Sequence, residues 1–95
     1  MTKVLRDHLL QELEKARKKI DRIDRKLLTL LNQRLNAAQA IGKIKKEMGK
    51  KTYAPKREKE VLKRLKIENR GPLKGKDLEK IFRAIMKVCR EAQKP

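Results

Sequence analysis

The stretch LLNQRLNAAQAIGKIKK, residues 30–46, has the apolar spacing of an amphipathic helix, but a permanent charge interrupts its apolar stripe. Leu27, Arg34 and Ile41 follow one another at intervals of seven, so all three lie on one face of a helix. A buried guanidinium costs several kcal/mol unless its charge is paired. Arg34 therefore serves either as a polar residue that fixes helix register or as part of a site that receives an anion.

The same pattern extends in both directions and predicts a long helix over residues 8–48. Two apolar rows with a mean period of 3.5 residues run along it, namely Leu13, Ile20, Leu27, Ile41, Met48 and Ala16, Ile23, Leu30, Ala37, Ile44. At 1.5 Å per residue this helix is about 60 Å long, which exceeds the diameter of a globule of this size. We therefore expect its far end to pack on another chain.

Two shorter helices are predicted after the glycine at position 49, which suits a helix C-terminus. Pro55 favours the first turn of a helix over residues 55–68, whose inner face carries Val61, Leu62, Leu65. Asn69, Gly71 and Pro72 end that helix. The third helix, residues 75–93, has the apolar stripe Leu78, Ile81, Phe82, Ile85, Val88, Cys89, Ala92. The predicted fold is all-α, with three helices (long, short, medium) in one domain over residues 1–95, of which 1–7 form a short N-terminal extension.

Charge and length restrict the classes of function. The chain has 29 Lys and Arg against 12 Asp and Glu, a formal net charge of +17. Such a charge attracts nucleic acid, an acidic membrane or a small polyanion, and Lys-rich surfaces also occur in thermophile proteins. The single cysteine excludes an internal disulfide framework. With no signal-peptide pattern and no long apolar run, we expect a cytoplasmic protein without a membrane span. A chain of 95 residues buries little surface by itself, which favours oligomerisation.

Three cations on the long helix have a spacing that suits an anion. Lys45 follows Arg34 by eleven residues, which is a rotation of only about 20° and a rise of about 16 Å, so the two side chains can bracket a small ligand. Arg17 lies about 100° around the helix and about 25 Å away, and it reaches the same ligand only from a second copy of the chain. The alternatives are a solvated surface arginine at Arg17 and a snorkelling lysine at Lys45.

The shorter helices add two pairs of polar residues. Cys89 and Gln93 are four residues apart and share a face of the third helix. Arg57 and Glu58 lie in the first turn of the second helix, where a glutamate is also favoured by the helix dipole. Each residue also has a simpler interpretation. Cys89 would be an inert core residue, and Gln93 would be exposed to solvent. Arg57 and Glu58 would be ordinary capping charges.

Taken together, these residues resemble a known family. The segments ARKKIDRIDRKLLTLLNQRLNAAQAIGKIKK, YAPKREKEVLKRL and GPL…LEKIFRAIMKVCREAQ are similar to the all-helical, AroQ-class chorismate mutases over about residues 12–93. The third segment looks especially like the mutase module of bifunctional mutase–prephenate dehydratases and of fusions with DAHP synthase. The resemblance implies an intertwined homodimer of three-helix chains that converts chorismate to prephenate, toward phenylalanine and tyrosine, without a cofactor or metal.

The resemblance also implies roles for the cations and for Gln93. Arg34 would bind one substrate carboxylate, and Arg17 would bind the other across the dimer interface. Lys45 would contact that second carboxylate and the ether oxygen, to which Gln93 would also donate a hydrogen bond. Arg57 would support the cluster from its edge.

The resemblance implies three further contacts, and two of them involve residues that depart from the family pattern. Glu58 would hold the ring hydroxyl. The main-chain N–H of Ala54 would lie near that hydroxyl, where the family often has Asp, and the lost N-cap should cost about 1 kcal/mol. Cys89 would touch a carboxylate, where the family often has Ser, which is a better hydrogen-bond donor.

The residue inventory fits a rearrangement that needs neither a nucleophile nor proton transfer. The only histidine, His8, lies outside the match, and no catalytic triad or metal-ligand cluster is visible.

Three alternatives stay open: a basic helical module that binds nucleic acid, a coiled-coil dimerisation module without activity, and a mutase-like enzyme that removes pyruvate from isochorismate. The single Phe and Tyr give no stacking platform for single-stranded nucleic acid, and no nucleic-acid-binding motif is present.

Overall fold

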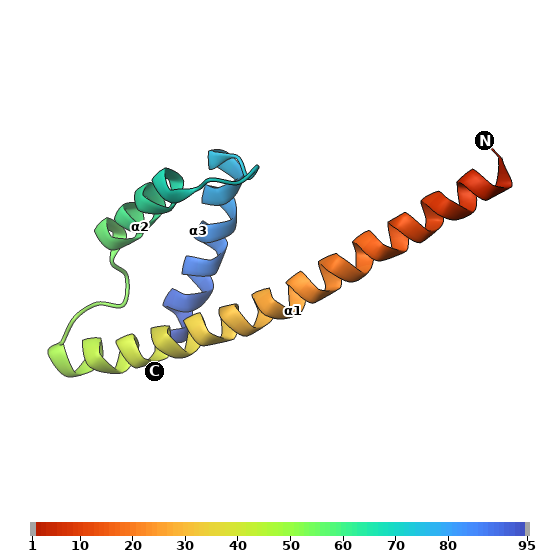
Figure 1. The fold of residues 1–95 in the computed structure, drawn as a ribbon. Helices are drawn as coiled ribbons and strands as arrows, with labels where there is room; N and C mark the ends of the chain where they lie inside the picture. Colours follow the sequence, from red (N-terminus) through yellow and green to blue (C-terminus); the bar gives the residue numbers. More distant parts are fainter. Residues whose placement is uncertain (1, 95) are drawn as a thin grey trace. The chain divides into compact units, whose positions relative to one another are not determined.

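The computed structural model describes residues 2–94, and within them every regular element is a helix: α1 (Lys3–Met48), α2 (Pro55–Glu68) and α3 (Gly75–Ala92) (Figure 1). The predicted all-α class and the order long, short, medium are confirmed. The chain divides into two compact units, one ending at Asn32 and the other beginning at Gln33. The division falls inside α1, and each unit is described by itself.

The first unit is a single stretch of helix with local interactions. Its helix begins at Lys3, earlier than the predicted residue 8, because the hydroxyl of Thr2 accepts a hydrogen bond from the Leu5 N–H at 3.2 Å. Its large apolar side chains are all exposed in the single chain: Val4, Leu5, Leu9, Leu10, Leu13, Ile20, Ile23, Leu27, Leu28, Leu30, Leu31. Across residues 2–94, no helix is long and apolar enough to cross a membrane.

The second unit begins with the last part of α1, which ends at a glycine as the sequence predicts. Gly49 has a φ of +69°, the left-handed conformation that glycine adopts without strain. The Lys50 N–H donates to the Lys45 carbonyl at 2.8 Å and the Gly49 N–H donates to the Lys46 carbonyl at 3.2 Å. These two bonds form a Schellman motif, which turns the chain toward α2.

Helices α2 and α3 pack against each other through a small core. The buried apolar residues of this unit are Ala38, Leu62, Leu78, Met86, Cys89. On α2 the predicted inner face is confirmed, with Leu62 buried and Val61 and Leu65 half-buried. On α3 two predicted stripe residues are exposed, Ile81 at 48% and Val88 at 57%, whereas Met86, which the predicted stripe left out, is buried.

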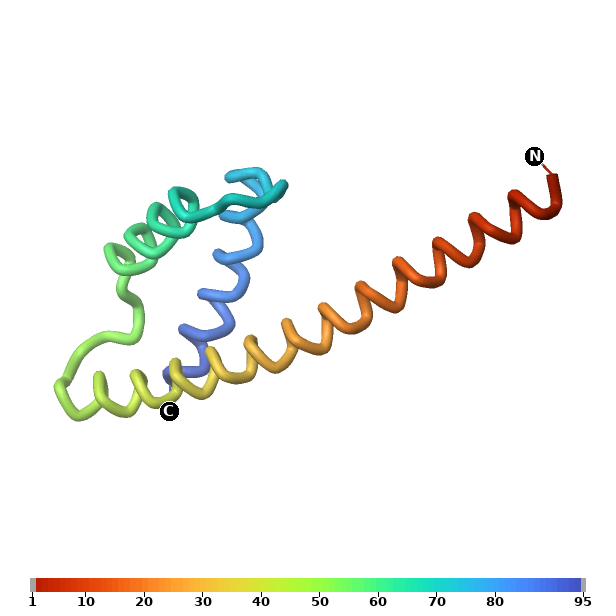
Figure 2. Tube along the Cα trace, viewed as in Figure 1, coloured from red at the N-terminus to blue at the C-terminus, as the bar shows by residue number. Residues whose placement is uncertain are grey.

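The C-terminal end of α3 returns to α1 and lies close to Gly42, as the blue and yellow parts of the trace show (Figure 2). A Cβ atom on Gly42 would lie 2.6 Å from the carbonyl oxygen and 2.8 Å from the Cα of Gln93. The covered face of α1 therefore carries Ala38 and Gly42, which are its only buried residues in the described chain. Small side chains allow the two helices to approach this closely.

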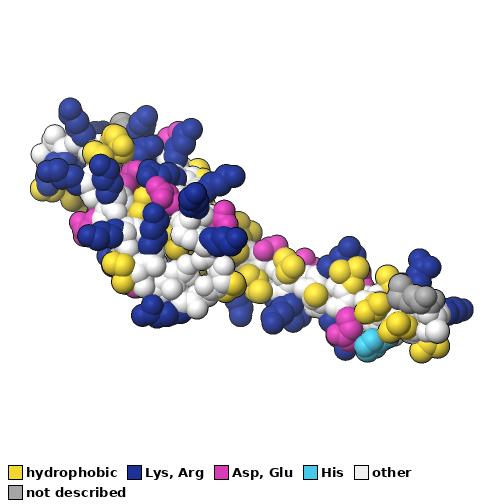
Figure 3. Space-filling model, turned by 90° about the horizontal axis from the view of Figure 1, so that it is seen from above, with side chains coloured by type: hydrophobic (Ala, Val, Ile, Leu, Met, Phe, Trp, Pro, Cys, Tyr) yellow, Lys and Arg dark blue, Asp and Glu magenta, His cyan; other side chains and the backbone are white. Residues whose placement is uncertain are grey.

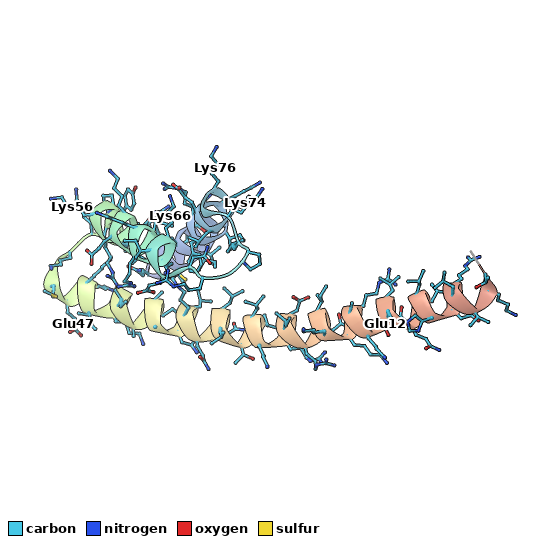
Figure 4. All side chains as sticks on the ribbon, turned by 45° about the horizontal axis from the view of Figure 1, so that its top comes forward. Glu12, Glu47, Lys56, Lys66, Lys74 and Lys76 are labelled. Carbon is cyan, nitrogen blue, oxygen red and sulfur yellow. The ribbon has the colours of Figure 1, made fainter. Side chains whose placement is uncertain are left out.

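Many lysine and arginine side chains lie on the face shown in Figure 3, with exposed apolar side chains among them. Lys74 and Lys76 stand at the start of α3, and Glu47 lies on the side of α1 away from α2 and α3 (Figure 4).

One exposed cluster connects the short helices: Lys66 of α2 contacts Glu79 of α3 at 2.7 Å, and Arg83 Nε donates to the same carboxylate at 2.9 Å. Both cations are exposed.

Candidate functional site

A cavity of about 440 Å³ lies among the three helices of the second unit. Seven of the eight residues predicted for the site line it: Arg34, Lys45, Ala54, Arg57, Glu58, Cys89, Gln93. They come from the end of α1, the start of α2 with the segment before it, and the end of α3. The fold thus brings together residues that are up to 59 positions apart in the sequence, from 34 to 93.

Lys45 and Gln93 are in direct contact inside this cavity. The Lys45 ammonium donates to Gln93 Oε1 at 3.0 Å and to the main-chain carbonyl of Thr52 at 2.9 Å. Both side chains are half-buried. Because Oε1 accepts from Lys45, the Gln93 amide is oriented, and its NH₂ group is left to donate to a ligand.

Gly42 fixes where Gln93 lies. The main chain of Gln93 sits so close to Gly42 that no side chain fits between them. Nothing in the sequence pattern links these two residues, and a glycine inside a helix is by itself only a tolerable cost. The contact depends on the return of α3 to α1, which the local pattern does not encode.

Arg34 is half-buried at the cavity wall, on the apolar row where the sequence places it. Among residues 2–94, no side chain or main-chain group forms a hydrogen bond or ion pair with its guanidinium. A cation that is partly removed from water and left without a partner favours an anionic ligand. Residues 2–94 therefore leave the Arg34 guanidinium available for an anion.

Glu58 has a partner that the sequence analysis missed. Arg90 Nη1 contacts Glu58 Oε2 at 2.8 Å, and the guanidinium carbon of Arg90 lies 4.5 Å from the centroid of the Tyr53 ring. Arg90 follows Phe82 and Met86 at intervals of four and so lies on the apolar stripe of α3. An arginine on such a stripe is the same signal that singled out Arg34, and it was available in the sequence.

The charges at the cavity are strongly unbalanced. Its lining includes four cationic side chains and one carboxylate, the cations being Arg34, Lys45, Arg57, Arg90. Arg57 lies at the rim, where it is exposed and contacts Glu60 at 3.4 Å. Such a wall attracts a small anion that carries more than one negative charge.

One predicted site residue belongs to the first unit, and another lines the cavity without a side-chain cap. Arg17 belongs to the first unit, where its exposed guanidinium contacts Glu14 at 3.2 Å. Ala54 occupies the N-cap position of α2 and makes no side-chain capping bond there, as expected from its missing carboxylate. Its neighbour Pro55 opens the helix, and Glu58 supplies the acidic residue of the first turn.

The side chains of the cavity suit binding and electrostatic stabilisation. Among residues 2–94, no three His, Cys, Asp or Glu side chains are grouped as metal ligands, and the Cys89 thiol is buried against the helices. Fixed cations and an oriented amide stabilise negative charge that develops on a bound molecule without any covalent step.

This chain is similar to several known proteins. A family model described as chorismate mutase type II matches residues 16–94. A bifunctional chorismate mutase/prephenate dehydratase of Neisseria gonorrhoeae is 39% identical over 79 residues, which is 83% of this chain and 21% of that protein. The chain thus spans about a fifth of the length of this curated relative.

Solved structures match over nearly their whole length. Chorismate mutase (Form II) from Thermus thermophilus is 36% identical, with a TM-score of 0.84, and the match covers 86% of this chain and 93% of that one. Chorismate mutase from Helicobacter pylori, in complex with prephenate, is 38% identical with a TM-score of 0.81, covering 87% and 90%.

Proposed function

Because this chain belongs to the chorismate mutase type II family, we propose that it converts chorismate to prephenate by an intramolecular [3,3] rearrangement. The observation that carries the proposal is the Lys45–Gln93 hydrogen bond inside a cavity with a cationic wall. Chorismate carries two carboxylates and one ether oxygen. The cavity offers fixed cations for the carboxylates and two donors for the ether oxygen.

The ether oxygen becomes more negative as its C–O bond breaks, and Lys45 and Gln93 stabilise it. The Lys45 ammonium has three N–H groups, of which Gln93 and Thr52 use two, so the third can donate to the ligand. An acceleration of about 10⁶ corresponds to roughly 8 kcal/mol. One donor that stabilises developing charge contributes about 3–4 kcal/mol, which is a large share of that total.

Arg34 binds one carboxylate of the substrate through its planar fork of donors. We assign the other carboxylate to Arg17 of a second copy of the chain, with further help from Lys45. The two arginines hold the flexible enolpyruvyl arm over the ring and so reduce the entropy lost in reaching the reactive geometry. Arg57 at the rim adds to the attraction of the dianion.

The remaining lining residues bind the ring. Glu58 accepts a hydrogen bond from the ring hydroxyl, near the main-chain N–H of Ala54. Cys89 packs against a carboxylate from the buried face of α3. On this proposal residues 1–95 act as one mutase domain in the cytoplasm, in the synthesis of phenylalanine and tyrosine, and need no cofactor.

We further propose an intertwined homodimer, which membership of the family suggests and which the exposed apolar rows of α1 support. Leu27 is 50% exposed and Ile20 is 56% exposed in the single chain, although both belong to the predicted heptad seam. Contiguous apolar surface of this kind marks an interaction site. A second copy that covers the seam also brings in the Arg17 that the first copy lacks at its own cavity.

The experiment is to add the purified protein to chorismate and follow the loss of chorismate absorbance, with a light-scattering mass measured on the same sample. We expect prephenate as the product and a mass of two chains. A protein that leaves chorismate unchanged, or that binds a DNA probe tightly with a steep salt dependence, would support an alternative function instead.

A further inference from the structure

Arg90 lies between two groups that belong to different elements. Its Nη1 contacts Glu58 Oε2 on α2 at 2.8 Å, and its guanidinium carbon lies 4.5 Å from the centre of the Tyr53 ring in the segment before α2. The ion pair is largely shielded from solvent, with 27% of the Arg90 side chain and 23% of the Glu58 side chain exposed. A guanidinium between an aromatic face and a carboxylate is held in position by both.

We propose that Arg90 is a positioning residue, which holds the Glu58 carboxylate in the orientation that receives the ring hydroxyl of the substrate. This inference rests on the proposed mutase function. Arg90 binds Oε2 alone, and Oε1 accepts no hydrogen bond from any group among residues 2–94. One oxygen is therefore fixed by α3, and the other is left at the cavity for the ligand.

The arrangement determines the rotamer of Glu58. A glutamate in the first turn of a helix otherwise keeps several rotamers, and a surface carboxylate turns toward water or toward the helix N-terminus. The contact with Arg90 selects the rotamer that points across to α3, and Tyr53 restricts the guanidinium in turn. The carboxylate is then in place before the substrate arrives, which avoids an ordering cost on binding.

A merely structural link between α2 and α3 is the competing explanation, and the chain offers a matched control for it. Lys66 and Glu79 form another ion pair between the same two helices, at 2.7 Å, and neither residue lines the cavity. Removal of either pair breaks a link between α2 and α3. Only the Arg90 pair contains a residue, Glu58, that is proposed to bind the substrate.

The test compares Arg90→Met, Glu58→Gln, the double variant and Lys66→Met, each assayed with chorismate and with a chorismate analogue that lacks the ring hydroxyl. We expect Arg90→Met to lower kcat/KM for chorismate about tenfold, as expected for the loss of one charge-assisted hydrogen bond. The double variant should be no worse than Glu58→Gln, and the effect of Arg90→Met should vanish with the analogue. Lys66→Met should keep full activity.

Two further variants keep the test decisive if Arg90→Met folds poorly. Arg90→Lys should restore part of the activity, and Tyr53→Leu should show a smaller loss that again disappears with the analogue. Additive losses in the double variant, or equal losses on both substrates, would overturn the assignment while the mutase function stands. A wild-type protein that does not rearrange chorismate would instead overturn the function and this assignment together.

Discussion

Lys45 is the residue on which the proposed chemistry depends most. Its ammonium is anchored by the Thr52 carbonyl and Gln93 Oε1, so it is preorganised at one place in the cavity wall. A charge that is already in position stabilises the transition state without reorganisation during the reaction.

Replacement of Lys45 by alanine should lower kcat by a factor of about 10² or more, on the scale of losing an oxyanion donor. The measurement is steady-state turnover of chorismate with saturating substrate. Lys46→Ala is the matched control, because Lys46 is the next residue on α1 and does not line this cavity. Near-normal turnover in Lys45→Ala would remove Lys45 from its assigned role.

The sequence predicts some of these residues well and others not at all. Arg34 and Lys45 stand out because their charges lie near an apolar helix face, and the structure places both at the cavity. The pairing of Arg90 with Glu58 was missed because a sequence pattern shows which face a residue occupies, but not which residue of another helix lies opposite. The reach of Arg17 to a site stays a prediction.

At the scale of the helices, the main chain of Gln93, the residue that follows α3, lies against Gly42 on α1. Alanine at this position would gain about 1 kcal/mol of helix propensity over glycine. Its Cβ would, however, lie 2.6 Å from the Gln93 carbonyl oxygen, and that atom belongs to the main chain. Overpacking of this kind costs typically about 1–3 kcal/mol, and a main-chain atom cannot swing away as a flexible side chain can, so the steric cost outweighs the gain in propensity.

We therefore expect Gly42→Ala to lower the free energy of unfolding and also to reduce kcat, because Gln93 is displaced from Lys45. Denaturant unfolding and turnover measure the two effects. The control is Gly75→Ala at the start of α3, where an added Cβ meets nothing within 4 Å. Gly42→Ala with unchanged turnover would show that the position of Gln93 does not depend on this contact.

The ion pairs between α2 and α3 predict a dependence of stability on pH. Hydrogen bonds from Lys66 and then Arg83 hold the pKa of the Glu79 carboxyl below its ordinary value of 4.5. A carboxyl with a lowered pKa in the folded state contributes stability above its unfolded pKa, and this stability is lost as the pH falls through the folded value.

The free energy of unfolding should therefore decrease as the pH falls below 4.5, and Glu79→Gln should show a smaller decrease over the same range. Denaturant midpoints of both proteins at a series of pH values provide the measurement. Identical pH slopes for the two proteins would contradict the assigned role of Glu79.

Helix boundaries were predictable where the chain carries strong local signals. Gly49, Pro55 and the Asn69–Gly71–Pro72 break all fall at or beside observed helix ends. The burial of α3 was only partly predictable: Ile81 and Val88 are exposed, and Met86 is buried instead. Which side of an apolar stripe is covered depends on the neighbouring helix, which spacing alone does not specify.

At the scale of the whole molecule, the proposed dimer accounts for both the exposed apolar rows of α1 and the source of the second carboxylate ligand. In that dimer a second copy of the chain covers the rows and supplies the ligand. The sequence indicates this from the length of the helix, and the single chain leaves Leu27 and Ile20 uncovered.

The most direct test of the account is to mix Arg17→Ala protein with Arg34→Ala protein, allow the chains to exchange, and assay chorismate turnover. Each variant alone should be nearly inactive. About half of the exchanged dimers should contain both variants, each with one intact site of two, so about a quarter of the wild-type activity should return. If mass measurements prove that the chains have exchanged and no activity returns, the two arginines do not come from different copies and the shared site is wrong.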